Sequence, residues 1–249
     1  MRPGGKDVLY NLSEHGLLYS NKNPKIPGSI LSDCNSVLEN IRHDPVAHMR
    51  NNHNFTFFKQ PLLYDSFAKI VLLDEVLKLP FLFFEGRDFF LGTVNLRSSK
   101  ETAHPETTTT LFHRDQNLGS LKSTRGNFLK VFVYLTDVSH ENGPFTYIVG
   151  SNKNQKEDSN KYRIPDEEVY KMYGNDTEIK CIAPAGSIIS ADTTGLHKGT
   201  KVKKGYRDMF TINFCTKKEK NTEMFQIKRS FKEKMEKHKI PLFRYYSEV

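Results

Sequence analysis

The chain has 249 residues, of which 37% are hydrophobic and 12% aromatic, so it can bury a sizeable core as one large domain. Its formal net charge is +8, it has three widely spaced cysteines, and no apolar run approaches the roughly 18 residues that span a bilayer. These features argue against a disulfide framework and a transmembrane helix. Residues 1–6 also lack the basic-then-apolar pattern of a signal peptide, so we expect a soluble cytoplasmic protein.

The first 87 residues are predicted to be mostly helical and to support a sheet. Ser29–Arg42 places apolar residues near helical spacing. Pro61–Leu79 has a stronger apolar stripe. Pro80 is expected to end that helix, because proline has no N–H to donate to the preceding turn.

From residue 88 the apolar period changes to that of β-strands. The expected strands are Phe89–Arg97, Thr107–Asp115, Asn127–Val138, Phe145–Val149, Ser187–Ala191 and Arg207–Cys215. The turn signal Glu141–Pro144 makes Phe145–Val149 the expected partner of the strand before it. Several short strands with turn signals between them predict a mainly β sandwich or jelly roll over residues 88–216.

Two polar stretches interrupt these strands, and a helix is expected after them. Residues 116–126 and 151–180 show little periodicity, and loops of this length are usually either functional lids or disordered. In residues 217–249, apolar side chains at helical spacing predict an amphipathic helix on the sheet: Met224, Ile227, Phe231 and Met235. We therefore expect one domain over residues 1–249, with helical support in 1–87, the β core in 88–216 and a C-terminal helix in 217–249.

Three residues indicate a metal centre. His113 and Asp115 flank Arg114, and alternation along a strand would point the first two side chains to one face and Arg114 to the other. His197, on a short segment flanked by glycines, offers a second imidazole from a distant strand. Two histidines and one carboxylate leave coordination positions open for a co-substrate and O2, which suits a non-haem Fe(II). The alternative is a hydrogen-bonded pair of core histidines, with Asp115 capping a turn.

Arg207 lies ten residues after His197, at the start of a predicted strand. Its guanidinium is a planar fork that can bind a carboxylate through two parallel hydrogen bonds. Inside a barrel near the metal, it would hold the far carboxylate of a dicarboxylic co-substrate. The alternative is a surface arginine, since residues 198–207 also hold four lysines.

Further segments extend this pattern in a fixed order. They are Phe112–Gln116, Phe128–Val138, Glu141–Phe145, Gly150–Ser151, Gly195–His197 and Arg207, which together cover about residues 88–216. The combination resembles the phytanoyl-CoA dioxygenase-like family of Fe(II)/2-oxoglutarate-dependent oxygenases. The resemblance implies a double-stranded β-helix, the cupin-like form of the jelly roll, with flanking N- and C-terminal α-helices and the metal at the open end.

The resemblance also implies cofactors and a reaction. His113, Asp115 and His197 would bind Fe(II), and 2-oxoglutarate would chelate that iron while Arg207 pairs with its C5 carboxylate. Reaction with O2 would release succinate and CO2 and remove hydrogen from an unactivated C–H bond of the substrate, which is usually hydroxylated. Relatives that halogenate lack the carboxylate ligand, so Asp115 favours hydroxylation or another oxidation.

Weaker signals mark further candidate residues. Lys130 lies where the family often has a polar residue that reaches the co-substrate or substrate, although an outward-facing edge lysine is the alternative. Many such oxygenases have a serine or threonine two positions after the arginine, where this chain has Met209, so Thr211 is the candidate second contact to the C5 carboxylate. Asp192 is expected to cap a turn. Candidate pocket residues, with solvent exposure as the alternative for the first two, are Asn95, Arg97, Gln116, Phe132, Tyr134 and Asn213.

Together these residues predict a dioxygenase that hydroxylates a small or medium-sized polar metabolite. The basic segments 198–207 and 217–244 favour an anionic substrate. The same hydrogen abstraction can also end in desaturation, cyclisation or epimerisation, and a non-catalytic jelly roll that binds or senses a ligand is a further alternative. No nucleic-acid-binding motif accompanies the charge, so neither nucleic acid nor a membrane is an expected partner. The sequence leaves the oligomeric state open.

Overall fold

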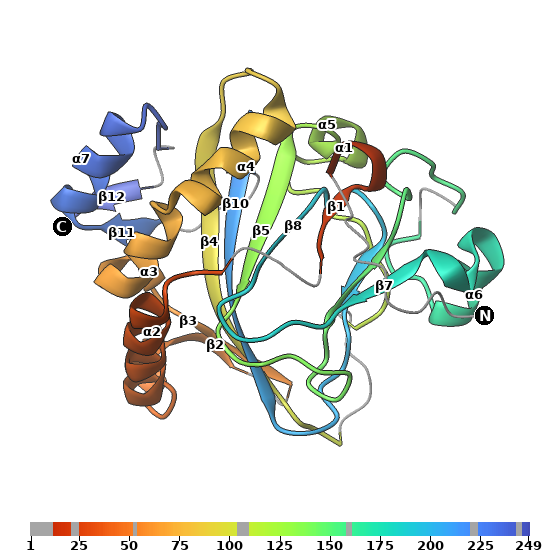
Figure 1. Ribbon diagram of the computed structural model, residues 1–249, viewed down its shortest axis with the longest axis horizontal. Helices are drawn as coiled ribbons and strands as arrows, with labels where there is room; N and C mark the ends of the chain where they lie inside the picture. Colours follow the sequence, from red (N-terminus) through yellow and green to blue (C-terminus); the bar gives the residue numbers. More distant parts are fainter. Residues whose placement is uncertain are drawn as a thin grey trace.

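Two facing antiparallel sheets dominate the computed structural model, which describes residues 12–20, 25–51, 54–103, 110–157, 161–219, 224–242 and 246–249 (Figure 1). The larger sheet has seven strands in the order β1-β8-β5-β10-β4-β3-β2, and the smaller has three in the order β7-β6-β9. The larger sheet contains β1 (Leu17–Leu18), β2 (His48–Asn51), β3 (Phe55–Phe58), β4 (Phe90–Lys100), β5 (Phe128–Tyr134), β8 (Ile188–Ala191) and β10 (Tyr206–Cys215). The smaller contains β6 (Phe145–Ile148), β7 (Glu178–Cys181) and β9 (His197–Gly199).

The central strands have one apolar face and one face with polar positions, because side chains alternate along a strand. From β10, the main apolar core receives Phe210, Ile212 and Phe214. The alternate residues Arg207, Met209 and Thr211 line a cavity between the two sheets. The strand alternation expected from the sequence therefore separates packing residues from cavity residues.

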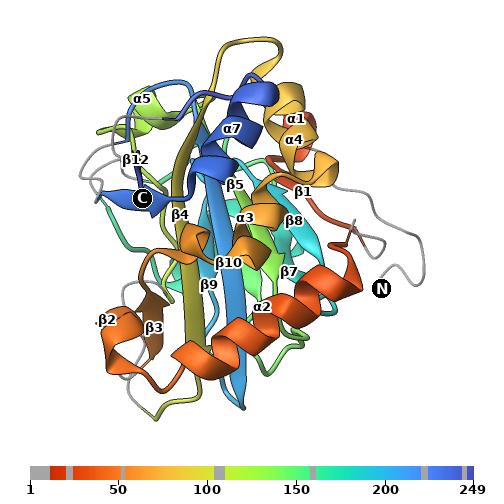
Figure 2. The same ribbon diagram turned by 90° about the vertical axis from the view of Figure 1, so that its left-hand side faces the viewer.

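Helices cover the face of the larger sheet that is opposite the smaller sheet (Figures 1 and 2). They are α2 (Gly28–Ile41), α3 (Asp65–Val71), α4 (Asp74–Phe84) and α7 (Arg229–Lys237), and a parallel ribbon of β11 (Phe225–Ile227) and β12 (Tyr246–Glu248) lies beside α7. Their apolar sides join one core with β4, β5 and β10. The other helices are α1 (Leu12–His15), α5 (Leu121–Thr124) and α6 (Asp166–Tyr173), with 3-10 turns at Pro45–Ala47, Pro61–Leu63 and Asn175–Thr177.

The predicted fold class is confirmed: the chain forms a mainly β jelly roll with flanking helices. Within the described part of the chain, no helix is long and apolar enough to cross a membrane.

The N-terminal region differs from the prediction in two ways. Strands β2 and β3, which the sequence did not suggest, extend the larger sheet. The expected helix over Pro61–Leu79 is divided into a 3-10 turn, α3 and α4, and Pro80 lies inside α4. Proline removes one hydrogen bond there. The helix continues because Phe84, one turn later, is fully buried and stacks on Phe89 with ring centroids 5.5 Å apart.

The predicted pairing of Phe145–Val149 with the preceding strand is wrong. β6 pairs with β7 and β9 in the smaller sheet, whereas β5 pairs with β8 and β10 in the larger one. The turn before β6 passes through Gly143, whose φ is +72° and where an added Cβ would meet the carbonyl oxygen of Thr200. The chain thus crosses between sheets at this turn instead of forming a hairpin.

Two other stretches hold more structure than the sequence predicted. Residues 151–180 include α6 and the start of β7, so only part of this polar stretch is loop. The expected helix around Met224–Met235 begins only at Arg229, because Phe225–Ile227 is a strand that pairs with β12. Apolar residues three or four positions apart can come from a short strand followed by a short helix, so this spacing did not separate β11 from α7.

Candidate active site

Backbone pairing brings the three predicted metal ligands together. His113 and His197 exchange two backbone hydrogen bonds, each with an N···O distance of 3.0 Å. The Asp115 N–H donates to the carbonyl of Thr193 at 2.8 Å. The strand predicted over Thr107–Asp115 is reduced to isolated bridges at Phe112 and His113, and residues 107–109 lie outside the described part of the chain.

The three side chains converge on one point. His113, Asp115 and His197 each offer a ligand atom, and these atoms all lie within 4.8 Å of one another. The Nδ1 atoms of the two histidines lie 2.9 Å from the carbonyls of Leu111 and Gly195. Donation from Nδ1 to a carbonyl leaves Nε2 unprotonated and available to a metal. The group therefore has the donor types and the orientation of a metal centre.

The electrostatics of this group also favour metal binding. Burial lowers the pKa of His113, and burial together with the neighbouring His113 lowers the pKa of His197 to about 3. Burial alone would raise the pKa of Asp115, but Lys130 and the two histidines outweigh it and hold that pKa well below its usual value. Neutral imidazoles and an ionised carboxylate are the protonation states that bind metals.

Lys130 points into the site rather than outward. Its Nζ lies 2.6 Å from Oδ2 of Asp115, and both side chains are largely buried. Lys130 comes from β5, and Asp115 from the segment that follows the His113–His197 pairing. The alternative of an edge lysine in solvent is therefore wrong, and Lys130 reaches the metal group itself.

Arg207 is among the most buried side chains of the protein. It is 1% exposed, and its Nε and Nη1 atoms have no hydrogen-bond partner among the described residues. Within the described structure, its one hydrogen bond runs from Nη2 to the Ser99 hydroxyl, at 3.5 Å. Burial lowers the pKa of this guanidinium. Leaving a buried cation without a counter-charge is costly, so an anionic ligand is the simplest partner for Arg207.

The metal group and Arg207 share one cavity of about 630 Å³. Most of the predicted cofactor and pocket residues line it: Asn95, Arg97, Gln116, Lys130, Phe132 and Thr211. Met209 lines it as well, at the position where relatives often have a hydroxyl side chain. The surface alternative for Arg97 and Asn95 is thereby excluded.

Two predicted pocket residues lie elsewhere. Tyr134 is fully buried between the sheets, where its hydroxyl donates to the Cys181 carbonyl at 3.0 Å and accepts from the Phe145 N–H. Asn213 donates to the Thr93 hydroxyl at 2.6 Å. Both share a strand face with cavity residues, but they lie beyond the ends of the cavity.

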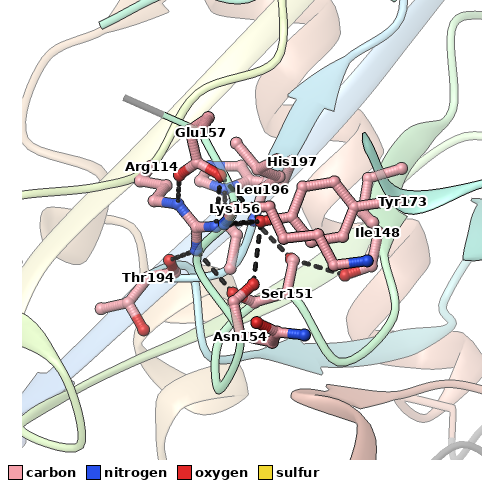
Figure 3. A network of polar contacts seen from close by, with 11 residues as sticks. Arg114, Ile148, Ser151, Asn154, Lys156, Glu157, Tyr173, Thr194, Leu196 and His197 are labelled. Carbon is pink, nitrogen blue, oxygen red and sulfur yellow. Dashed lines mark hydrogen bonds and ion pairs between the residues drawn. The ribbon is translucent and has the colours of Figure 1, made fainter. Parts of the chain in front are cut away.

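Arg114, between the two predicted ligands His113 and Asp115 in the sequence, is bound in a network of polar contacts (Figure 3). Its Nε and Nη2 pair with both carboxylate oxygens of Glu157, and its Nη1 donates to the Ser151 carbonyl at 2.7 Å. The Tyr173 hydroxyl lies 2.7 Å from the same carboxylate. Glu157 and Tyr173 belong to the stretch that the sequence left unassigned, so this stretch anchors the segment that carries His113 and Asp115.

Ser151, from the Gly150–Ser151 motif, positions the segment of the third ligand. Its hydroxyl donates to the Ile148 carbonyl at 2.6 Å and accepts from the Leu196 N–H at 2.7 Å. Asp192 caps the turn before this segment, because it accepts from the N–H and hydroxyl of Thr194. The cap predicted for Asp192 is therefore confirmed.

The sequence did not single out several cavity residues. They are Phe57 on β3, Phe145 on β6, and Tyr162 and Arg163 beside the Phe112–Ile164 bridge. No motif surrounds Arg163 or Tyr162. Their place at the site follows from the pairing of Ile164 with Phe112, next to His113.

Two facing sheets with a two-histidine, one-carboxylate group at their shared cavity define the class of jelly-roll non-haem iron oxygenases. The sequence model of the phytanoyl-CoA dioxygenase (PhyH) family matches residues 32–203. The chain belongs to this family. It is accordingly an enzyme that depends on Fe(II) and 2-oxoglutarate.

Solved structures share the fold at low sequence identity. The 2-oxoglutarate-dependent epimerase SnoN from nogalamycin biosynthesis is 15% identical, with a TM-score of 0.62 over 82% of this chain and 77% of its own. HygX from Streptomyces hygroscopicus, with nickel, 2-oxoglutarate and hygromycin B bound, is 19% identical, with a TM-score of 0.57 over 87% of this chain and 88% of its own. The non-haem monooxygenase ThoJ is 17% identical, with a TM-score of 0.56 over 82% and 75%. No curated protein sequence matches significantly.

Proposed function

We propose that this enzyme hydroxylates a small or medium-sized, polar, anionic metabolite and releases succinate and CO2. One observation carries the proposal: a buried guanidinium without a counter-charge, that of Arg207, faces the same cavity as His113, Asp115 and His197. A dicarboxylic keto acid fits this arrangement. Its keto-acid end can bind a metal, and its far carboxylate can pair with the Arg207 cation.

The metal is assigned to His113, Asp115 and His197. Two imidazole nitrogens and one carboxylate oxygen match the ligand set of a non-haem Fe(II), and they leave positions free for other ligands. When bound, the iron supplies oxidative decarboxylation of 2-oxoglutarate by O2 and hydrogen abstraction from the substrate. The protein holds both imidazoles by their Nδ1 atoms, so that Nε2 of each would be available to bind the metal.

The co-substrate is assigned to Arg207, with Thr211 and Lys130 as further contacts. The Arg207 fork would pair with the C5 carboxylate through two hydrogen bonds. Thr211 lies four residues further along β10 on the same face and lines the cavity. Lys130 is held at Asp115 and is close enough to the metal group to contact an oxygen of the bound keto acid.

The rest of the cavity is assigned to the substrate. Gln116, from the 116–126 stretch, accepts from the Tyr162 hydroxyl at 3.2 Å, and both residues line the cavity. These segments would limit the access of water during turnover. Desaturation, cyclisation or epimerisation would require the same residues and differ in how the substrate radical is held.

Turnover without a known substrate tests this assignment. Anaerobic protein is supplied with Fe(II) and 2-oxoglutarate, and succinate is measured after O2 is admitted. We expect succinate from the wild type that requires both additions, and none above background from His113→Ala. A non-catalytic binding protein would bind 2-oxoglutarate without forming succinate, which would contradict the proposal.

We also infer a reducing, cytoplasmic location and a single domain over residues 1–249. The three cysteines support the location, because Cys34, Cys181 and Cys215 are buried free thiols. Neither nucleic acid nor a membrane is among the proposed partners.

A further inference from the structure

The cavity holds more positive charge than iron and 2-oxoglutarate account for. Among the described residues, its lining includes five cations and one carboxylate, Asp115. The cations are Arg97, Arg114, Lys130, Arg163 and Arg207. Which of them lack a counter-charge decides what else the cavity can bind.

Three of the five are already matched. Arg114 is paired with Glu157. Lys130 is paired with Asp115. Arg207 is matched by the C5 carboxylate under the proposed function, and the other carboxylate of 2-oxoglutarate binds the metal. Arg97 and Arg163 form no ion pair among the described residues, although Asp115 also attracts Arg163.

Arg97 presents only its edge to the cavity. Its guanidinium carbon lies 4.4 Å from the ring centroid of Phe55 and 5.5 Å from that of Phe57. These rings occupy its face, and its Nε is buried without a hydrogen-bond partner in the described structure. Burial and the neighbouring Arg207 lower the pKa of Arg97 to about 9. An anion at its edge would offset both costs.

Arg163 approaches the cavity from another element. It precedes Ile164, which bridges to Phe112 next to the ligand His113. Its Nη1 donates to the Tyr162 carbonyl at 2.8 Å, but its Nε is buried and has no partner among the described residues. Arg97 lies on the larger sheet and Arg163 beside the metal group, so together they border the space left for a substrate.

We propose that Arg97 and Arg163 form the substrate's anion-binding site, and that the substrate carries a carboxylate or phosphate group. This inference rests on the proposed function, since it assigns Arg207 to the co-substrate. A guanidinium binds both kinds of anion through paired hydrogen bonds, so the structure names their shared chemistry. The two arginines are substrate-positioning residues that determine specificity.

Three probe molecules, each with one phenyl ring, distinguish a phosphate site, a carboxylate site and the absence of an anion-binding site. Protein loaded with Ni(II) and 2-oxoglutarate is titrated calorimetrically with phenyl phosphate, benzoate and neutral benzyl alcohol. We expect at least one anion to bind about tenfold or more tightly than the alcohol, since a hydrogen bond to a charged group contributes about 1.5–3 kcal/mol. The preferred anion identifies the group.

Single substitutions assign the binding to these residues. Arg97→Gln and Arg163→Gln should each weaken the preferred anion by roughly tenfold or more. Arg125→Gln, the same change at an exposed arginine outside the cavity lining, should have no effect. Affinity for 2-oxoglutarate, measured by the visible absorbance of the anaerobic Fe(II) complex, should stay within about threefold in both cavity variants.

The inference is overturned if neither anion binds better than benzyl alcohol, or if the two variants retain wild-type affinity for the anion. It is also overturned if Arg97→Gln weakens 2-oxoglutarate as strongly as Arg207→Gln, because Arg97 would then serve the co-substrate. Failure of the proposed function has a different signature. In that case the wild-type protein itself would form no succinate when it is supplied with Fe(II), 2-oxoglutarate and O2.

Discussion

Arg114 and Arg207 both line the cavity of the metal group and are buried to a similar degree, but their surroundings differ. The Arg114 side chain is 6% exposed and is bound by a carboxylate, a tyrosine hydroxyl and backbone carbonyls (Figure 3). Arg207 is 1% exposed and has two guanidinium nitrogens without a partner among the described residues. A buried charge that the protein matches supports structure, whereas an unmatched one indicates a ligand.

Arg114, whose charge is paired with Glu157, should control the stability of the protein. Arg114→Gln leaves Glu157 buried without its cation, and breaking a buried pair in this way costs about 3–5 kcal/mol. The free energy of unfolding, measured by urea denaturation, should fall by that amount, with Arg125→Gln as the control. Wild-type stability in Arg114→Gln would show that the two arginines do not differ as described.

Arg207, which has no counter-charge among the described residues, should control the binding of 2-oxoglutarate. Arg207→Gln removes two charge-assisted hydrogen bonds to the C5 carboxylate, so 2-oxoglutarate should bind about 3 kcal/mol, or roughly 100-fold, more weakly. The free energy of unfolding of the apoprotein should not fall, because the substitution removes a buried cation that lacks a counter-charge. Loss of stability without loss of 2-oxoglutarate affinity would reverse the assignment.

Tyr134 tests where the cavity ends on β5. Tyr134→Phe removes a buried hydroxyl that serves Cys181 and Phe145, which should cost about 1–2 kcal/mol of stability. The KM for 2-oxoglutarate should be unchanged, because Tyr134 does not line the cavity. A raised KM at wild-type stability would restore Tyr134 to the pocket.

The effect of Lys130 on metal binding should be the smallest of these effects, because it depends on the pH. The Lys130 cation lowers the pKa of Asp115 and of both histidines, so Lys130→Met should raise all three pKa values. Metal binding requires all three groups deprotonated. It should therefore be lost at a higher pH in the variant than in the wild type as the pH falls. An acid titration of the Co(II)-loaded proteins, followed by visible absorbance, measures this limit. An unchanged or lower limit would contradict the role of Lys130.

The sequence was sufficient for residues whose chemistry and spacing carry information locally. His113 and Asp115 are two apart, and their convergence with His197 needed only the strand order of a jelly roll. The alternation of side chains also predicted correctly which face of each strand lines the cavity. That face, however, extends beyond the cavity at both ends. Tyr134 and Asn213 lie on the predicted faces and contact other protein groups instead.

Long-range pairing explains the remaining differences. Residues 151–180 show little periodicity, yet Glu157 and Tyr173 hold Arg114, and Arg163 reaches the cavity through the Ile164–Phe112 bridge. Each of these contacts joins residues about 40 or more positions apart, as in Arg114 and Glu157, which are separated by 43. Local propensity carries no information about such partners.

The sequence by itself determined the ligand set, the family and therefore the reaction class, because chemistry at an iron centre depends on a few residue types at short, recognisable spacings. Only the tertiary structure decided which of the cavity's cations are paired within the described part of the chain. Arg97, Arg114, Arg163 and Arg207 are alike in sequence, and whether each is neutralised depends on which carboxylates the fold brings within hydrogen-bond distance. That difference separates the arginine that is paired within the protein from those to which we assign a ligand.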